Sequence, residues 1–323
     1  MALAGIVTVQ DLINQIREES DMQYSGFVSD LAIATHINNS GKELYDILVT
    51  SYGDNYFLAP PANFNTDNIR DRFPLPDGVL PFNHGDQTPF IAPPFFKLAG
   101  VDLQLGATPQ SYVTLRMFPL NERNKFSVPN FASFYGFTNI RYSLYGMNEI
   151  WFTPLPAAGL TLRLRYVPRM PNIVSSFVVN GAIGTPTLTT TDLLSPQVNQ
   201  NIFGPGIPAN TIIAAIPSPG TLTLSQNLTA PVVNQVVQVF SYTQTMDWVN
   251  GWEEYIVVDC AIKMLGKEES DVTVLGGRKA ALLGRIQGVA ANRDQGSAGK
   301  TSDVMGNYLW GGDGTSNGDG YNW

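Results

Sequence analysis

The residue types that most often perform catalysis or bind metals are scarce in this chain. It has two histidines, His36 and His84, and one cysteine, Cys260, and none of the three lies near further ligands at metal-site spacing. One cysteine cannot form an intrachain disulfide. Neither a Gly-rich phosphate loop nor a G-x-S-x-G nucleophile motif is found. We therefore expect no enzyme activity, no metal and no cofactor.

The charged residues near the C-terminal end favour a structural role. Asp259 interrupts an apolar run over 256–262. It could be a buried functional carboxylate. We favour the alternative, in which it belongs to a solvated stripe or forms an intersubunit ion pair with Arg285 or Arg293. We interpret Glu253 and Glu254 as part of a solvated helix face or of a subunit contact, and not as catalytic carboxylates. The predicted intersubunit contacts are therefore Glu253, Glu254, Asp259, Arg278, Arg285 and Arg293.

These residues lie on a predicted helical hairpin over 247–303. Asp247 is a candidate N-cap, and Trp252, Tyr255, Cys260 and Met264 recur mostly at three- and four-residue steps, the spacing of one helix face. A polar break over 266–271 separates this helix from a second one, and two helices joined by a short turn usually lie antiparallel. Because two helices alone bury one face poorly, we expect the N-terminus to return and pack on them.

The N-terminal 53 residues carry the other helical patterns. Thr8 and Asp11 form a candidate capping box, and Ser29 is the candidate N-cap of a second helix. The polar middle of that helix, over 38–41, predicts a kink. The predicted fold class is therefore α+β: a discontinuous helical bundle from 1–53 and 246–303, with a central β meander and an inserted all-β module.

The middle of the chain divides into two parts. Proline is so frequent over 54–97 that we predict an extended loop there, followed by a β meander over 98–170 with apolar alternation. Together they make the predicted 54–170 unit. Residues 171–245 contain one charged residue, Asp192, and several short strand patterns. They predict a small all-β module that either closes on itself or is covered by neighbours.

Composition restricts the partners. Charged residues make up 14% of the 323 positions, below the usual value of about 25%. The net charge of −8 argues against a sequence-independent nucleic-acid binder. An acidic channel surface would nevertheless repel phosphate and let DNA pass without binding it. We find no signal peptide and no run long enough for a membrane span. We therefore expect a chain made in the cytoplasm that does not enter a membrane.

The last segment, 304–323, is an extended tail rich in Gly and polar residues but also in aromatics. Disordered tails usually lack large aromatic residues, so these rings are predicted to anchor the tail on a partner. The predicted anchors are Tyr308, Leu309, Trp310, Tyr321 and Trp323.

Two segments at opposite ends of the chain resemble one protein family. The N-terminal motif is FVSDLAIATHINNSGKELYDILV (27–49), and the strand pattern before the module ends in YVPRMP (166–171). The hairpin residues that carry the likeness are Trp252, Glu253, Glu254, Tyr255, Ile256, Val257, Ala261, Lys263, Lys267, Glu268, Glu269, Asp271, Leu275, Arg278, Ala281, Leu282, Arg285, Ile286, Ala291, Arg293, Asp294 and Gly296. The arrangement resembles the head-to-tail adaptor (head-completion, or tail-tube-A-like) proteins of tailed bacteriophages.

That resemblance implies a structural virion protein at the head–tail junction. It implies a ring of twelve copies beneath the portal protein, joined below to the tail nozzle or tail tube and continuing the channel for double-stranded DNA. The aromatic tail would reach the portal. The run GPGIPANTIIAAIPSPGTLTLSQNLTAP (204–231) separately resembles a small β domain found on phage virion proteins.

Two other functions stay open. One is a tail nozzle, hub or other tail protein of the same virion. The other is a receptor- or carbohydrate-binding β protein that uses 171–245 as its binding module, which exposed Trp or Tyr side chains would favour. The module has one Tyr, Tyr242, and no Trp.

Overall fold

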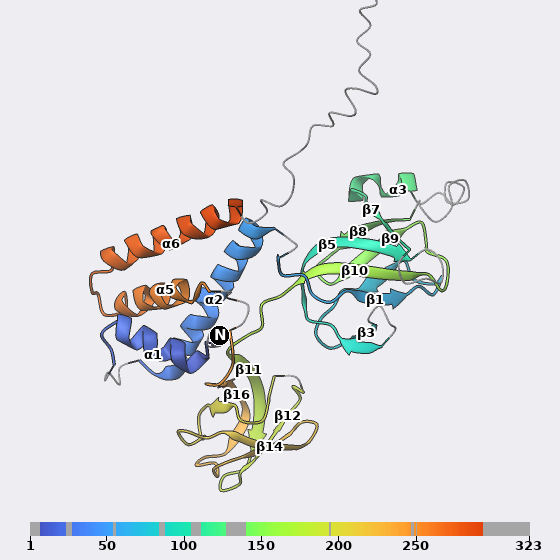
Figure 1. Ribbon diagram of the computed structural model, residues 1–323. Coiled ribbons are helices and arrows are strands. Elements are labelled where there is room, and N and C mark those ends of the chain that lie inside the picture. Colours follow the sequence, from blue (N-terminus) through green and yellow to red (C-terminus); the bar gives the residue numbers. More distant parts are fainter. Residues whose placement is uncertain are drawn as a thin grey trace, which may run out of the picture.

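The computed structural model describes residues 7–23, 28–53, 56–83, 88–104, 111–126, 140–193, 195–246, 249 and 251–292. Within these ranges the chain forms 16 strands in three sheets and five α-helices, and 29% of it is helical. Figure 1 shows a helical lobe and two β lobes. The predicted α+β fold dominated by a helical bundle is therefore wrong, because the chain is mostly β.

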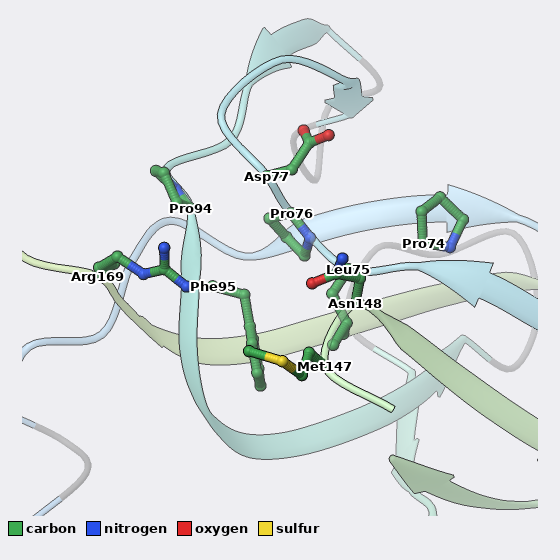
Figure 2. A pocket seen from close by; sticks show the side chains of 9 residues that line it. All are labelled: Pro74, Leu75, Pro76, Asp77, Pro94, Phe95, Met147, Asn148 and Arg169. Carbon is green, nitrogen blue, oxygen red and sulfur yellow. The ribbon is translucent and has the colours of Figure 1, made fainter. Parts of the chain in front are cut away.

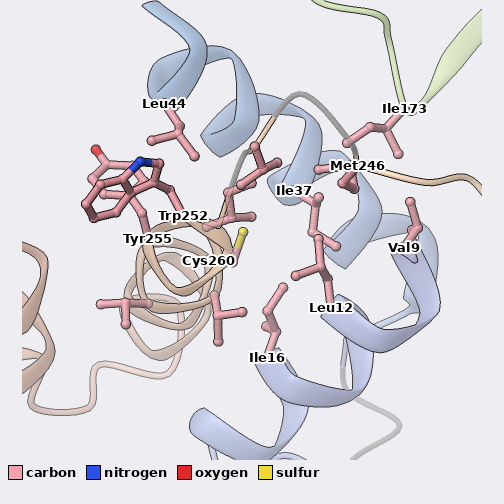
Figure 3. Close-up of a cluster of buried hydrophobic side chains, with 14 of the residues drawn as sticks. Val9, Leu12, Ile16, Ile37, Leu44, Ile173, Met246, Trp252, Tyr255 and Cys260 are labelled. Atoms are coloured by element: carbon pink, nitrogen blue, oxygen red, sulfur yellow. The ribbon is translucent and has the colours of Figure 1, made fainter. Parts of the chain in front are cut away.

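The helical lobe contains α1 (Val9–Glu19), α2 (Asp30–Tyr52), α5 (Glu253–Leu265) and α6 (Thr273–Asn292). Helices from both ends of the chain share one hydrophobic core, in which α5 contacts α1, α2 and α6. Figure 3 shows side chains from α1, α2 and α5 meeting there. The N-terminal helices therefore do pack on the C-terminal hairpin.

Local sequence signals place the first two helices. Thr8 and Asp11 form the predicted capping box, in which the Asp11 backbone N–H donates to the Thr8 hydroxyl and the Thr8 N–H donates to the Asp11 carboxylate. The Ser29 hydroxyl accepts from the Ala32 N–H at the start of α2. The polar middle of α2 does not interrupt the helix, because Asn38 and Ser40 are buried against other elements.

The first β lobe holds two sheets around one core. Its strands are β1 (Ala62–Asn65), β2 (Arg72–Pro74), β3 (Pro81–Asn83), β4 (Pro89–Ile91), β5 (Phe95–Gln104), β6 (Tyr112–Thr114), β7 (Arg116–Met117), β8 (Arg141–Tyr145), β9 (Glu149–Thr153) and β10 (Thr161–Pro168). The six-stranded sheet has the order β4-β3-β1-β10-β5-β6, and the four-stranded sheet has the order β2-β9-β8-β7. A 3₁₀ turn (Leu120–Glu122) and α3 (Arg123–Phe126) follow β7.

The predicted extended loop over 54–97 is wrong, and so is the simple meander after it. The segment contributes β1, β2, β3, β4 and the start of β5, and β1 pairs with β10 about a hundred residues later in the chain. Proline is tolerated because the strands are short and because Pro81 and Pro89 begin edge or near-edge strands. Three-residue strands are too short to show an alternation of apolar and polar residues, so the sequence pattern does not predict them.

The second β lobe is a six-stranded sheet with the order β13-β16-β11-β12-β15-β14. Its strands are β11 (Ser175–Gly181), β12 (Thr187–Thr190), β13 (Asn201–Phe203), β14 (Ile213–Ser218), β15 (Thr221–Leu224) and β16 (Val232–Phe240). The two outer strands meet, since the Ile202 N–H donates to the Thr211 carbonyl at 3.0 Å and the Ile213 N–H donates to the Gln200 carbonyl at 2.9 Å. Of the two alternatives, the module closes on itself, which protects its uncharged edges.

The two connections to this lobe are anchored in the helical core. Ile173 and Phe240 are buried in that core, and the Ile173 N–H donates to the Asn38 side chain at 3.0 Å. Thr245 forms an antiparallel bridge with Thr8, just before α1. The module is therefore attached to the bundle by packed segments and not by free linkers.

Candidate interaction surfaces

The largest group of charges in the helical lobe surrounds Asp259. This residue is 3% exposed, and its two carboxylate oxygens accept from Lys263 Nζ at 2.5 Å and from Lys279 Nζ at 2.8 Å. Lys279 also donates to Glu43 at 2.9 Å, and Lys263 to the buried Ser40 hydroxyl at 2.9 Å. The network joins α2, α5 and α6.

This network shifts the proton affinity of its members. Burial acts to raise the pKa of Asp259, but the hydrogen bonds from Lys263 and Lys279 outweigh it, so the pKa lies below the usual value. Burial raises the pKa of the Cys260 thiol to about 12, which leaves it protonated and unreactive at neutral pH. The cluster therefore stabilises helix packing and contains no activated nucleophile.

Asp259 is buried and not part of a solvated stripe, and its pairing with Arg285 or Arg293 of another copy stays a prediction. Asp259 pairs with two lysines of its own chain and not with Arg285, whose guanidinium lies 5.4 Å from the centre of the Trp252 ring. Arg293 lies outside the described residues, as do the five predicted tail anchors Tyr308, Leu309, Trp310, Tyr321 and Trp323.

Arg278 connects three helices. It donates to Glu19 of α1 at 2.6 Å and to Glu254 of α5 at 2.9 Å. Two of the residues predicted for subunit contacts, Arg278 and Glu254, thus bind each other inside one chain. Glu253 lies beside them, at the edge of a hollow between α1, α5 and α6.

The side of α6 that faces away from the bundle is built from small residues. Leu282 and Ile286 are buried against the other helices. The opposite side of the helix carries five exposed small residues: Gly277, Ala280, Ala281, Gly284 and Gly288. A Cβ atom added at each of these three glycines meets nothing within 4 Å. Within the part of the chain that the structure describes, no packing requires glycine at Gly277 or Gly284.

The three arginines in and directly after β10 fall into two groups. Arg163 and Arg165 both donate to the buried Asp102, at 2.9 Å and 2.8 Å. Arg169 instead lines a hollow of about 190 Å³ together with Asp77, Phe95, Met147 and three prolines (Figure 2). The residues around this hollow do not combine a nucleophile with a base, so it shows no catalytic arrangement.

Other site chemistry is also lacking in the described part of the chain. No group of three His, Cys, Asp or Glu side chains is close enough to hold a metal ion there. His36 lies 3.0 Å from Lys267 Nζ, and burial followed by the charge of that lysine lowers its pKa. His84 is outside the described residues. Among the described helices, none has the length and apolar character of a membrane span.

The sequence alone missed Ser40, Glu43 and Lys279 as members of the Asp259 network. The available signal was the small or polar run over 38–41 inside a helical pattern, which indicates that another side chain packs there. Comparison with known sequences adds nothing further: no protein-family model matches the chain, and no curated protein shows significant similarity to it.

Proposed function

We propose that this chain is a structural virion protein, the head-to-tail adaptor ring of a tailed bacteriophage. In this role about a dozen copies join the portal to the tail nozzle or tail tube and continue the DNA channel. The chain is synthesised in the host cytoplasm and assembles at the head–tail junction. The N-terminal and C-terminal motifs that resemble adaptor proteins support this proposal, and in the structure these two ends form one packed lobe.

The observation that carries the proposal is the outward side of α6. Glycine inside a helix costs about 0.5–1 kcal/mol relative to alanine. The outward glycines Gly277 and Gly284 therefore weaken the isolated helix without any packing benefit among the described residues. Small residues allow another backbone to approach closely. A neighbouring copy that packs against this surface explains their presence.

A ring suits the rest of the surface. The exposed apolar side chains Val274 (82% exposed) and Val289 (47%) lie on the same helix. A subunit contact would remove them from water. The net charge of −8 suits a protein that surrounds passing DNA without binding it.

A substitution on α6 tests the proposal. Gly284→Glu places a charged side chain on the outward surface, where the isolated chain has open space. We expect the variant to fold with an unchanged or higher unfolding midpoint and to fail to form rings on portal-bearing particles viewed by negative-stain electron microscopy. The matched control is Asn39→Glu, on an exposed position of α2. Ring assembly by Gly284→Glu at the wild-type level would refute the role of this surface.

A cleft at the junction of the module and the bundle favours the second candidate, a carbohydrate-binding protein. The cleft has a volume of about 640 Å³ and is lined by hydroxyl and amide side chains, among them Asn172, Gln197, Asn199 and Gln244. Such groups suit a neutral polyhydroxyl ligand, but none of the described residues that line the cleft has an aromatic ring to stack on a sugar. Specific binding to immobilised glycans, lost in Asn199→Ala, would favour this candidate over the adaptor.

A further inference from the structure

One face of the four-stranded sheet combines arginines with aromatic rings. The Arg72 guanidinium lies 4.0 Å from the centre of the Tyr145 ring and 5.6 Å from that of Trp151. Arg72 pairs in register with Trp151, and Arg116 at the other edge pairs with Arg141. Because side chains alternate along a strand, these residues project from the same side of the sheet, here called the arginine face.

Two arginines of this face are not neutralised within the chain. In the ranges that the structure describes, Arg72 and Arg116 are exposed and neither forms an ion pair or a side-chain hydrogen bond. Glu149 is the one carboxylate on the same side, two residues from Trp151. Stacking on Tyr145 fixes the plane of the Arg72 guanidinium and leaves its N–H groups for an anion.

This positive face contrasts with the rest of the molecule. Residues 56–169 contain ten Lys or Arg and seven Asp or Glu, a net charge of +3, whereas the whole chain carries −8. The remaining segments therefore carry −11. A large share of that negative charge lies in the helical lobe.

The opposite charge is concentrated in the hollow between α1, α5 and α6. This acidic hollow, about 580 Å³, is lined by Glu18, Glu19, Glu253 and Glu254 and by one cation, Arg278. Arg278 is already bound to Glu19 and Glu254. Among the described residues, Glu18 and Glu253 have no such partner. Glu18 lies in the last turn of α1, where the helix dipole disfavours a carboxylate, so its position does not stabilise its own helix.

We infer that the arginine face of one copy docks on the acidic hollow of a second copy. The two surfaces belong to different lobes (Figure 1), so one chain cannot bring its own pair together as it is folded here. A contact between two different surfaces of identical chains is heterologous, and repeating it generates a closed ring or a filament. The inference rests on the proposed adaptor function and specifies which surfaces meet.

A second copy fits the arginine face better than nucleic acid does. The overall charge of −8 repels phosphate at long range, and the face offers few cations where a duplex requires a row of them. A carboxylate-lined hollow supplies the anions that Arg72 and Arg116 lack. Because Arg72 and Arg116 are exposed, we expect high salt to weaken the contact.

Two charge reversals test the contact. Arg72→Glu gives a copy with a reversed face and an intact hollow, and Glu253→Lys gives the complementary copy. Self-association is measured by sedimentation equilibrium at low salt for wild type, for each variant alone and for their equimolar mixture. We expect each variant to self-associate at least fivefold more weakly than wild type, and the mixture to recover association, because each variant supplies the surface that the other requires.

Lys42→Glu, an equal charge change at an exposed position of α2, is the control and should behave as wild type. A mixture that associates no more tightly than either variant alone overturns the inference. The inference is also overturned if short duplex DNA binds the wild type and binds Arg72→Glu more weakly. These outcomes leave the adaptor function standing, since ring formation on portal-bearing particles tests that function separately.

Discussion

Replacing Asp259 by asparagine is the sharpest test of how the helical lobe is held together. Asparagine has nearly the same shape but no charge, and one oxygen remains to accept a hydrogen bond. Asp259 is 3% exposed, and its carboxylate binds Lys263 at 2.5 Å and Lys279 at 2.8 Å. The change therefore removes both ionic contacts, leaves one oxygen to accept a hydrogen bond from one lysine, and leaves two lysines beside each other.

The expected cost follows from this geometry. Removing one member of a buried ion pair typically costs about 3–5 kcal/mol. The lysine side chains are 32% and 28% exposed, so both can turn toward water, and Glu43 still holds Lys279. Because both lysines can reach water, we expect a smaller cost than that range: Asp259→Asn should lower the free energy of unfolding of the helical lobe by about 2–3 kcal/mol at pH 7.

Urea unfolding followed by circular dichroism at 222 nm measures this loss, because the helical signal comes mainly from this lobe. The pH dependence provides a second test. The folded pKa of Asp259 lies below the unfolded value of about 3.9. The stabilisation is therefore fully present above that unfolded value and is lost as pH falls through the folded pKa. The gap between wild type and Asp259→Asn should narrow below about pH 4.

The matched control is Asp46→Asn, at an exposed position of α2, with an expected change within about 0.5 kcal/mol. If Asp259→Asn changed the free energy of unfolding no more than that control does, the Asp259 network would not stabilise the helical lobe. A gap of unchanged size from pH 7 to pH 3 would show that the variant loses packing and not charge.

Two deletions test the other lobes. Ser176 and Gln238 are direct cross-strand partners, so replacing 177–237 by Asn-Gly should leave the helical circular-dichroism signal intact. Deleting 173–244 should reduce that signal, because Ile173 and Phe240 belong to the bundle core. Equal loss of helical signal in both variants would contradict this. Deleting 306–323 should abolish co-sedimentation with the portal while the unfolding midpoint stays constant, and unchanged co-sedimentation would exclude the aromatic anchors.

The two ends of the chain could be predicted well because they carry strong periodic signals. The α1 face of Val9, Leu12, Ile13 and Ile16 is buried as its spacing predicts. The start of α5 was less certain: the described helix begins at Glu253, with Trp252 as its N-cap, and the candidate cap Asp247 lies outside the described residues. Periodicity locates a helix more reliably than it locates its first residue.

The middle of the chain could not be predicted because its contacts are distant in sequence. Asn63 pairs with Arg163, and Ser175 with Val239, and no local pattern identifies such partners. The prolines over 54–97 were also misleading, since in edge strands a missing N–H costs little.

The candidate site was predicted in part. Charged residues of α5 and α6 do form the main ionic clusters, but most of their partners lie in the same chain. Lys263 and Lys279, and not Arg285, bind Asp259, because they lie on the side of each helix that faces α2. Predicting that choice requires the rotation of each helix in the bundle, which spacing alone leaves open. The outward glycines of α6 were visible in the sequence, yet only the structure shows that no described atom lies within 4 Å of a Cβ added at Gly277 or Gly284.

The most direct test of the central claim is electron microscopy of phage particles produced from the genome that carries this gene, with the chain located by a fused tag or a specific antibody. We predict label in a ring between the portal and the tail, with the symmetry of the portal. Label confined to the tail tip, to fibres or to the capsid surface, or its absence from the particle, would contradict the adaptor function.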